Sequence, residues 1–186
     1  MKKLAIIISL LILFPATAGC AITNNYGPYY GKVVDAETKE PIEGAAVLVV
    51  FYTEEYGPAG AITRFADAVE TLTNKSGEFN MSVHKVTVFR PLQGWDKYGY
   101  FTIFKPGYGC YPKHKYVRPM LVPNGTLPPD KVVIIELPKL RNKEERLENY
   151  GCYPSELVPE TKYINLFNLI QQERIALGLE PRKMPK

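Results

Sequence analysis

Between Tyr30 and Leu137 the chain alternates short runs of β-branched and aromatic residues with turns, and this pattern indicates a series of strands. Gly, Pro, Asn and Asp separate the runs, which are too short for most helices. Strands are expected over residues 30–35, 45–53, 69–73, 78–83, 85–89, 99–104 and 131–137. Such a series predicts an all-β fold, an antiparallel β-sandwich of about seven strands.

After Pro138 the pattern becomes helical and predicts a C-terminal helical extension over residues 139–186. Asn142 and Glu145 have the spacing of a capping pair for a short helix through Asn149. Pro159 is expected to begin a longer helix that ends near Gly178. One stripe of that helix is apolar and should pack on its own domain, with partner binding as the alternative. The stripe contains Tyr163, Leu166, Phe167 and Ile170.

The first nineteen residues are predicted to be a signal peptide and not part of the fold. Lys2 and Lys3 precede an apolar run over residues 4–14. That run is shorter than the ~20 residues that a membrane-spanning helix needs.

Two cleavage sites follow the apolar run. Residues 17–20 read Thr-Ala-Gly-Cys and resemble the lipobox of bacterial lipoproteins, which predicts lipidation of Cys20. Acyl chains on Cys20 would anchor the protein to a membrane of the bacterial cell envelope, facing outside the cytoplasm. Ala21 follows instead of Asp, which implies the outer membrane in a Gram-negative cell. Cleavage after Ala18 is the alternative and would release a soluble periplasmic or secreted protein.

The chain has three cysteines, an odd number for an exported protein. Lipidation of Cys20 would leave Cys110 and Cys152 to form a disulfide bond in an oxidising compartment. Each lies in the same pentapeptide, Tyr-Gly-Cys-Tyr-Pro. Two unpaired buried thiols are the alternative.

Charge argues against nucleic acid as a partner. Without Lys2 and Lys3, 21 basic residues face 19 acidic residues. This balance provides neither a nucleic-acid footprint nor a polybasic membrane patch. A mature chain of about 165 residues is enough for one domain with a real core.

Residues 31–47, GKVVDAETKEPIEGAAV, resemble the opening of the carboxypeptidase regulatory-like family of transthyretin-like sandwiches. TLTNKSGEF at 71–79 and KPGY at 105–108 follow in the order expected for that family. The resemblance covers residues 29–138 and leaves residues 20–28 as an N-terminal linker. It implies a domain that accompanies enzymes without doing chemistry itself.

Two segments depart from the pattern of this family. Residues 54–68 lie where the family turns quickly, and residues 109–130 are crowded with Tyr, Pro and basic side chains. Both are expected to be long loops, which on a rigid sandwich either carry function or have drifted without one.

Catalytic and metal-binding motifs are not evident, so we expect neither an enzyme nor a cofactor. The two histidines, His84 and His114, stand outside any metal-binding spacing. His114 with Cys110 and Cys152 could form part of a zinc site, but a fourth ligand is missing and a disulfide explains the cysteines better.

Aromatic residues around the strand at 99–104 are the candidate ligand-binding set. Flat rings on the rim of a sandwich can stack on sugars or anchor a protein partner, or they can pack the loops on the sheet. The set comprises Trp95, Tyr98, Tyr100, Tyr111 and Tyr116.

The sequence therefore favours a membrane-anchored lipoprotein that acts as a protein-binding or structural accessory module. Residues 54–68 and the C-terminal helix are the expected contacts with an envelope protein. A carbohydrate-binding module that uses the aromatic set to bind a polysaccharide is the alternative. An uncharacterised enzyme is the third hypothesis, and it would need a pocket that joins His84 or His114 to carboxylates.

Overall fold

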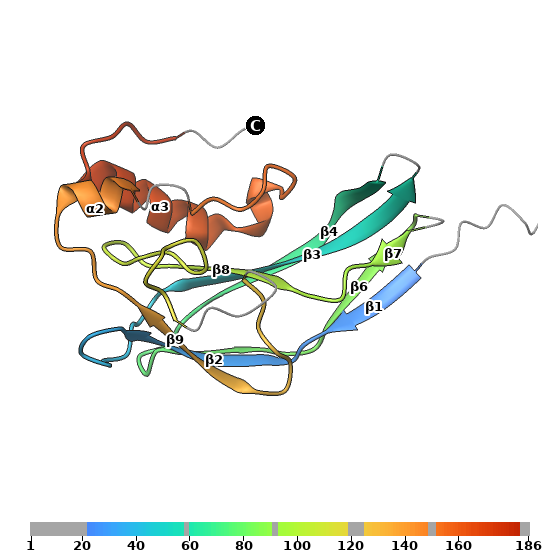
Figure 1. Cartoon of the computed structure of the whole chain (residues 1–186), viewed down its shortest axis with the longest axis horizontal. Coiled ribbons are helices and arrows are strands. Elements are labelled where there is room, and N and C mark those ends of the chain that lie inside the picture. Colours follow the sequence, from blue (N-terminus) through green and yellow to red (C-terminus); the bar gives the residue numbers. More distant parts are fainter. Residues whose placement is uncertain (1–21, 58–59, 91–92, 119–124, 149–151, 183–186) are drawn as a thin grey trace, which may run out of the picture.

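A computed structural model describes residues 22–57, 60–90, 93–118, 125–148 and 152–182. These residues form mainly strands, with two α-helices and a 3₁₀ turn near the C-terminus (Figure 1). The strands are β1 (Ile22–Tyr26), β2 (Tyr29–Asp35), β3 (Ala46–Gly57), β4 (Gly60–Leu72), β5 (Glu78–Met81), β6 (His84–Val88), β7 (Gly94–Trp95), β8 (Tyr100–Phe104) and β9 (Val132–Leu137). The helical elements are α2 (Lys143–Glu148), η2 (Glu160–Lys162) and α3 (Ile164–Ala176).

The strands form two layers, which confirms the predicted all-β sandwich. One layer contains β5-β2-β9 and the two-stranded sheet β1-β6, and the other contains β4-β3-β7 with β8 also paired to β3. The pairings are antiparallel except for β2 with β9, which run parallel from Tyr30↔Val132 to Asp35↔Leu137. All seven predicted strands are present, and the ends of six of them are shifted by a few residues at most. The seventh, predicted over 69–73, is the last part of the longer strand β4.

The main core lies between the two layers. Alternate residues of β3 point inward, and Val47, Val49 and Phe51 have almost no exposed surface. They meet inward-facing side chains such as Val33 on β2 and Ile135 on β9. This alternation with a period of two is what allows one strand to serve two faces.

The C-terminal extension forms a third layer on the other face of β3. Ala46, Leu48 and Val50 point that way and pack against α3. The predicted helical stripe is buried there, so this helix packs on its own domain as expected. Its members Tyr163, Leu166, Phe167 and Ile170 are all at most 5% exposed.

The predicted signals at the ends of the helices are confirmed except at Pro159, which does not begin the longer helix. The Glu145 N–H donates to Asn142 Oδ1 at 2.8 Å, and Asn142 Nδ2 donates back to Glu145 Oε1 at 3.1 Å. Pro159 precedes η2 rather than α3, which begins at Ile164, and Gly178 ends the helix with φ 76°. In the described part of the chain, no helix is long and apolar enough to cross a membrane.

Residues 54–68 were expected to be a loop, and this prediction is wrong. Residues 54–57 of β3 and 60–68 of β4 form a long antiparallel ribbon, with Tyr56 opposite Ala61 and Glu54 opposite Thr63. A bulge between Phe51 and Tyr52 shifts the register of the ribbon. The Tyr-Gly-Pro-Ala-Gly stretch at 56–60 was the turn signal within a β-rich run that could have predicted this hairpin.

The expected linker at 20–28 is also partly wrong. Its residues 22–26 form β1, which pairs with β6 from Ile22↔Val88 to Tyr26↔His84. Tyr26 stacks on Phe51 at a centroid distance of 4.3 Å, so β1 contributes to the core.

The described parts of segment 109–130 complete the free edge of β8. Ile103 and Tyr111 exchange backbone hydrogen bonds of 3.1 and 3.0 Å, and Phe101 N–H donates to the Gly125 carbonyl at 2.6 Å. Val117 and Leu127 are buried in the main core. The composition of this long segment therefore reflects packing on the sandwich.

Candidate functional site: a tyrosine-lined pocket

A pocket of about 330 Å³ opens between the outer face of β3 and β8 and the segment that follows Cys152. We call it the tyrosine pocket. Its size is at the lower end of the range for ligand-binding cavities. The side chains that carry its chemistry come from four parts of the chain and include Tyr52, Glu54, Asp96, Tyr100, Lys113 and Ser155.

The ribbon supplies one wall of the tyrosine pocket. Tyr52 and Glu54 are two residues apart on β3 and so lie on the same face, and Thr63 lies opposite Glu54 on β4. The Tyr56 hydroxyl, one further step along this face, donates to Glu54 Oε2. Glu54 and Thr63 belong to this wall because residues 54–57 and 60–68 are strands.

β8 and the turn before it supply the second wall. The Tyr100 hydroxyl donates to Asp96 Oδ2 at 2.8 Å, and the Tyr98 N–H donates to Asp96 Oδ1 at 3.1 Å. The Asp96 N–H in turn donates to the Tyr52 carbonyl at 3.1 Å, which fixes this turn to β3. The carboxylate of Asp96 is thereby held in one orientation beside the pocket.

The rings of Tyr52 and Tyr100 meet at an angle. Their centroids are 5.7 Å apart and their planes are inclined by 63°. Burial raises the pKa of Tyr52 and of Tyr100, and the negative charge of Asp96 adds to both shifts. Both phenols are therefore protonated and neutral at physiological pH.

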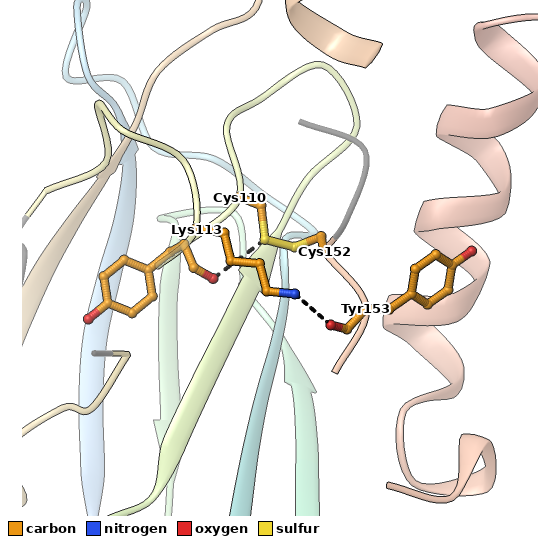
Figure 2. Close-up of a disulfide and its surroundings, with 5 residues drawn as sticks. Cys110, Lys113, Cys152 and Tyr153 are labelled. Carbon is orange, nitrogen blue, oxygen red and sulfur yellow. Dashed lines mark hydrogen bonds between the residues drawn. A yellow bond between two sulfur atoms is a disulfide. The ribbon is translucent and has the colours of Figure 1, made fainter. Parts of the chain in front are cut away.

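A disulfide tethers the third wall. Cys110 and Cys152 are bonded, as the sequence predicted, with their Cα atoms 6.0 Å apart (Figure 2). Both residues are buried. Near this bond, Lys113 Nζ donates to the Tyr153 carbonyl at 2.9 Å. Residues 153–155 are thus fixed to the loop after β8, where they line the tyrosine pocket. The disulfide also excludes the partial zinc site, because both sulfurs are bonded to each other.

The structure does not gather the five predicted aromatic residues into one binding face. Of these, Tyr100 lines the tyrosine pocket. Tyr111 is fully buried, and burial raises its pKa to about 12, so its prediction as a ligand-binding residue is wrong. Trp95 packs at the edge of the core, with its ring 6.2 Å from that of Tyr26.

The other two predicted aromatics do not line the tyrosine pocket, although the backbone N–H of Tyr98 contacts Asp96 there. Tyr98 is half-buried and lies beneath Lys97 Nζ at 5.5 Å from its ring centroid. Tyr116 is 60% exposed and contacts His114, with ring centroids 5.6 Å apart. Cys20, the predicted lipidation site, lies outside the described residues.

A second hollow, of about 300 Å³, brings His114 near carboxylates. Two of these carboxylates already have structural partners: Glu37 forms a two-pronged ion pair with Arg141, and Glu145 caps α2. Burial lowers the pKa of His114, so this ring is neutral at physiological pH. The tyrosine pocket, with two carboxylates beside two half-buried tyrosine rings, offers the more specific chemistry.

Metal ligands do not cluster in the described parts of the chain, where no three His, Cys, Asp or Glu side chains could hold one ion together. His84 Nε2 lies 2.9 Å from Asp67 Oδ2, and its ring stacks on Phe51. His84 therefore contributes to the packing between the two layers.

Comparison with known proteins identifies no relatives. No protein-family profile matches the chain, and neither a characterised protein nor a solved structure matches it significantly. The resemblance to the carboxypeptidase regulatory-like family therefore stays a prediction from residues 31–47 and the two later motifs.

Proposed function

We propose that the chain is a lipid-anchored module of the cell envelope that binds a partner protein by receiving one of its cationic side chains in the tyrosine pocket. Two inclined tyrosine rings and two carboxylates, Glu54 and Asp96, converge on one opening, and this convergence supports the proposal. Aromatic faces attract cations, and nearby carboxylates strengthen that attraction.

The charge of the pocket favours a cation over an anion. Glu54 and Asp96 provide two negative charges, and Lys113 provides one positive charge whose ammonium group points to the Tyr153 carbonyl. The angle between the two rings suits a compact group better than a flat sugar, which stacks on a single open face. These features favour a protein-binding module over the carbohydrate-binding alternative.

The envelope location is supported by independent features. The apolar run at residues 4–14 and the Cys20 sequence predict export and acylation. The Cys110–Cys152 disulfide is of the kind that persists in oxidising compartments outside the cytoplasm. The absence of a catalytic motif in the sequence led us to expect no enzyme, and the proposed binding role requires none.

Site-specific crosslinking in the native envelope tests the binding role. A photoreactive amino acid at Ser155, which is exposed and lines the pocket, should capture a partner protein, whereas one at Ser76 in the turn before β5 should not. Glu54→Gln should weaken capture, since it removes one of the two negative charges. Glu55→Gln is the matched control, because Glu55 pairs with Arg64 on the opposite face of the ribbon.

Two results would contradict the proposed binding role. One is the absence of any protein captured from position 155, and the other is equal capture by the Glu54→Gln and Glu55→Gln variants.

A further inference from the structure

One end of the elongated molecule carries the start of β1, and that start is close to the proposed anchor. Cys20 precedes Ile22, the first residue of β1, by two positions. Two residues span at most about 7 Å. An acylated Cys20 would therefore hold this end of the sandwich directly at the membrane surface, with almost no tether.

The residue beside the start of β1 is an exposed phenylalanine. Ile22 pairs with Val88, the last residue of β6, so Phe89 follows at the same end. The side chain of Phe89 is 76% exposed. Because this aromatic ring stays in water, it contributes little hydrophobic free energy to the folding of the chain.

The β3–β4 ribbon projects toward the same end (Figure 1). Arg90, next to Phe89, donates to the Phe65 carbonyl at 3.0 Å and to Thr53 Oγ1 at 3.3 Å, which joins the end of β6 to the ribbon. Beyond that junction the ribbon exposes two large side chains. They are Tyr56, 71% exposed, and Ile62, 53% exposed.

A bilayer provides the environment that these three side chains lack. Aromatic residues favour the interfacial region of membranes, and aliphatic side chains bury into it. Two basic side chains at this end, Arg64 and Arg90, are engaged with Glu55 and the Phe65 carbonyl. Apolar burial, rather than attraction to anionic lipids, would therefore drive contact.

We infer that this end of the molecule docks on the membrane, with Phe89, Tyr56 and Ile62 inserted into the lipid interface beside the acyl chains of Cys20. The inference rests on the lipid anchor of the proposed function and adds an orientation to it. The helix α2 and the end of α3 lie at the opposite end of the long axis (Figure 1). In the proposed orientation they would face away from the membrane.

Fluorescence quenching by brominated lipids tests this orientation. The chain has a single tryptophan, Trp95, so the Trp95→Phe variant provides a dark background. In that background, Phe89→Trp places a probe at the proposed membrane end. Ile175→Trp is the matched control, because Ile175 is 61% exposed near the end of α3. Both acylated variants are reconstituted in phosphatidylcholine vesicles with lipids brominated near the headgroup.

We expect the brominated lipids to reduce the emission of the probe at position 89 and to leave that of the probe at position 175 unchanged. This result should not require anionic lipid. An acylated, vesicle-bound protein in which both probes emit equally would overturn the docking and leave the anchor intact. A chain that carries no lipid by mass and stays out of the vesicles would overturn the anchor and the docking together.

Discussion

Asp67 on β4 shows how a single carboxylate joins the strands to the C-terminal extension. Its Oδ1 faces Lys162 Nζ of η2 at 2.7 Å, and its Oδ2 faces His84 Nε2 of β6 at 2.9 Å. Burial alone would raise the pKa of Asp67. Hydrogen bonds from Lys162, His84 and the Ala68 N–H outweigh that effect, so the pKa is lowered.

The lowered pKa of Asp67 predicts a dependence of stability on pH. Its contribution is fully present above the unfolded-state pKa of about 3.9 and is lost as pH falls through the lower folded-state pKa. The free energy of unfolding of the wild type should therefore fall on acidification below about pH 4, and this fall should be smaller in Asp67→Asn. Urea denaturation between about pH 5 and 2 measures both slopes.

Glu78→Gln is a suitable control for this experiment, since Glu78 is an exposed residue of β5 on another sheet. When Glu78→Gln is added to both proteins, the difference in pH slope between the wild type and Asp67→Asn should stay the same. Equal pH slopes in wild type and Asp67→Asn would show that the contacts of Asp67 with Lys162 and His84 do not stabilise the fold.

At the scale of elements, three kinds of contact besides the Asp67–Lys162 pair hold the extension after β9 on the sheet. The apolar stripe of α3 packs on Leu48 and Val50. Glu70 of β4 accepts the N–H groups of Asn165 and Leu166 at 2.8 and 2.6 Å and so caps α3 with a negative charge. The disulfide fixes the connection between α2 and η2.

Removal of the disulfide should destabilise the fold without abolishing it. The bond closes a loop with a sequence separation of 42 residues, and the Cys110→Ala/Cys152→Ala variant should lose about 4 kcal/mol in the free energy of unfolding by the chain-entropy estimate. The buried face of α3 should keep the variant folded. Urea denaturation of the wild type with and without reductant serves as the control. Identical unfolding curves under both conditions would contradict the stabilising role.

At the scale of the whole molecule, local signals predicted most of the fold. Gly77 is one example: it adopts φ 73° in the turn before β5, where a Cβ would lie 2.5 Å from the Val33 carbonyl oxygen. The apolar stripe of α3 and the capping pair of α2 were likewise readable, because each depends on residues a few positions apart. The parity of the cysteines correctly predicted the disulfide.

The tyrosine pocket could not be predicted from the sequence. It joins Tyr52 of β3, Asp96 and Tyr100 near β8, and residues 153–155, and only strand pairing and the disulfide bring these together. The register shift after Phe51 places Thr63, instead of Arg64, opposite Glu54 at the pocket. Pairing partners and register depend on packing across the whole sandwich, which a single sequence does not display.

The most direct test of the anchored module is the intact mass of the protein from the membrane fraction, before and after reduction and alkylation. We expect a chain that starts at an acylated Cys20, with Cys110 and Cys152 alkylated only after reduction. A lipid-free chain that starts at Gly19 would contradict the anchor and make the protein soluble outside the cytoplasm.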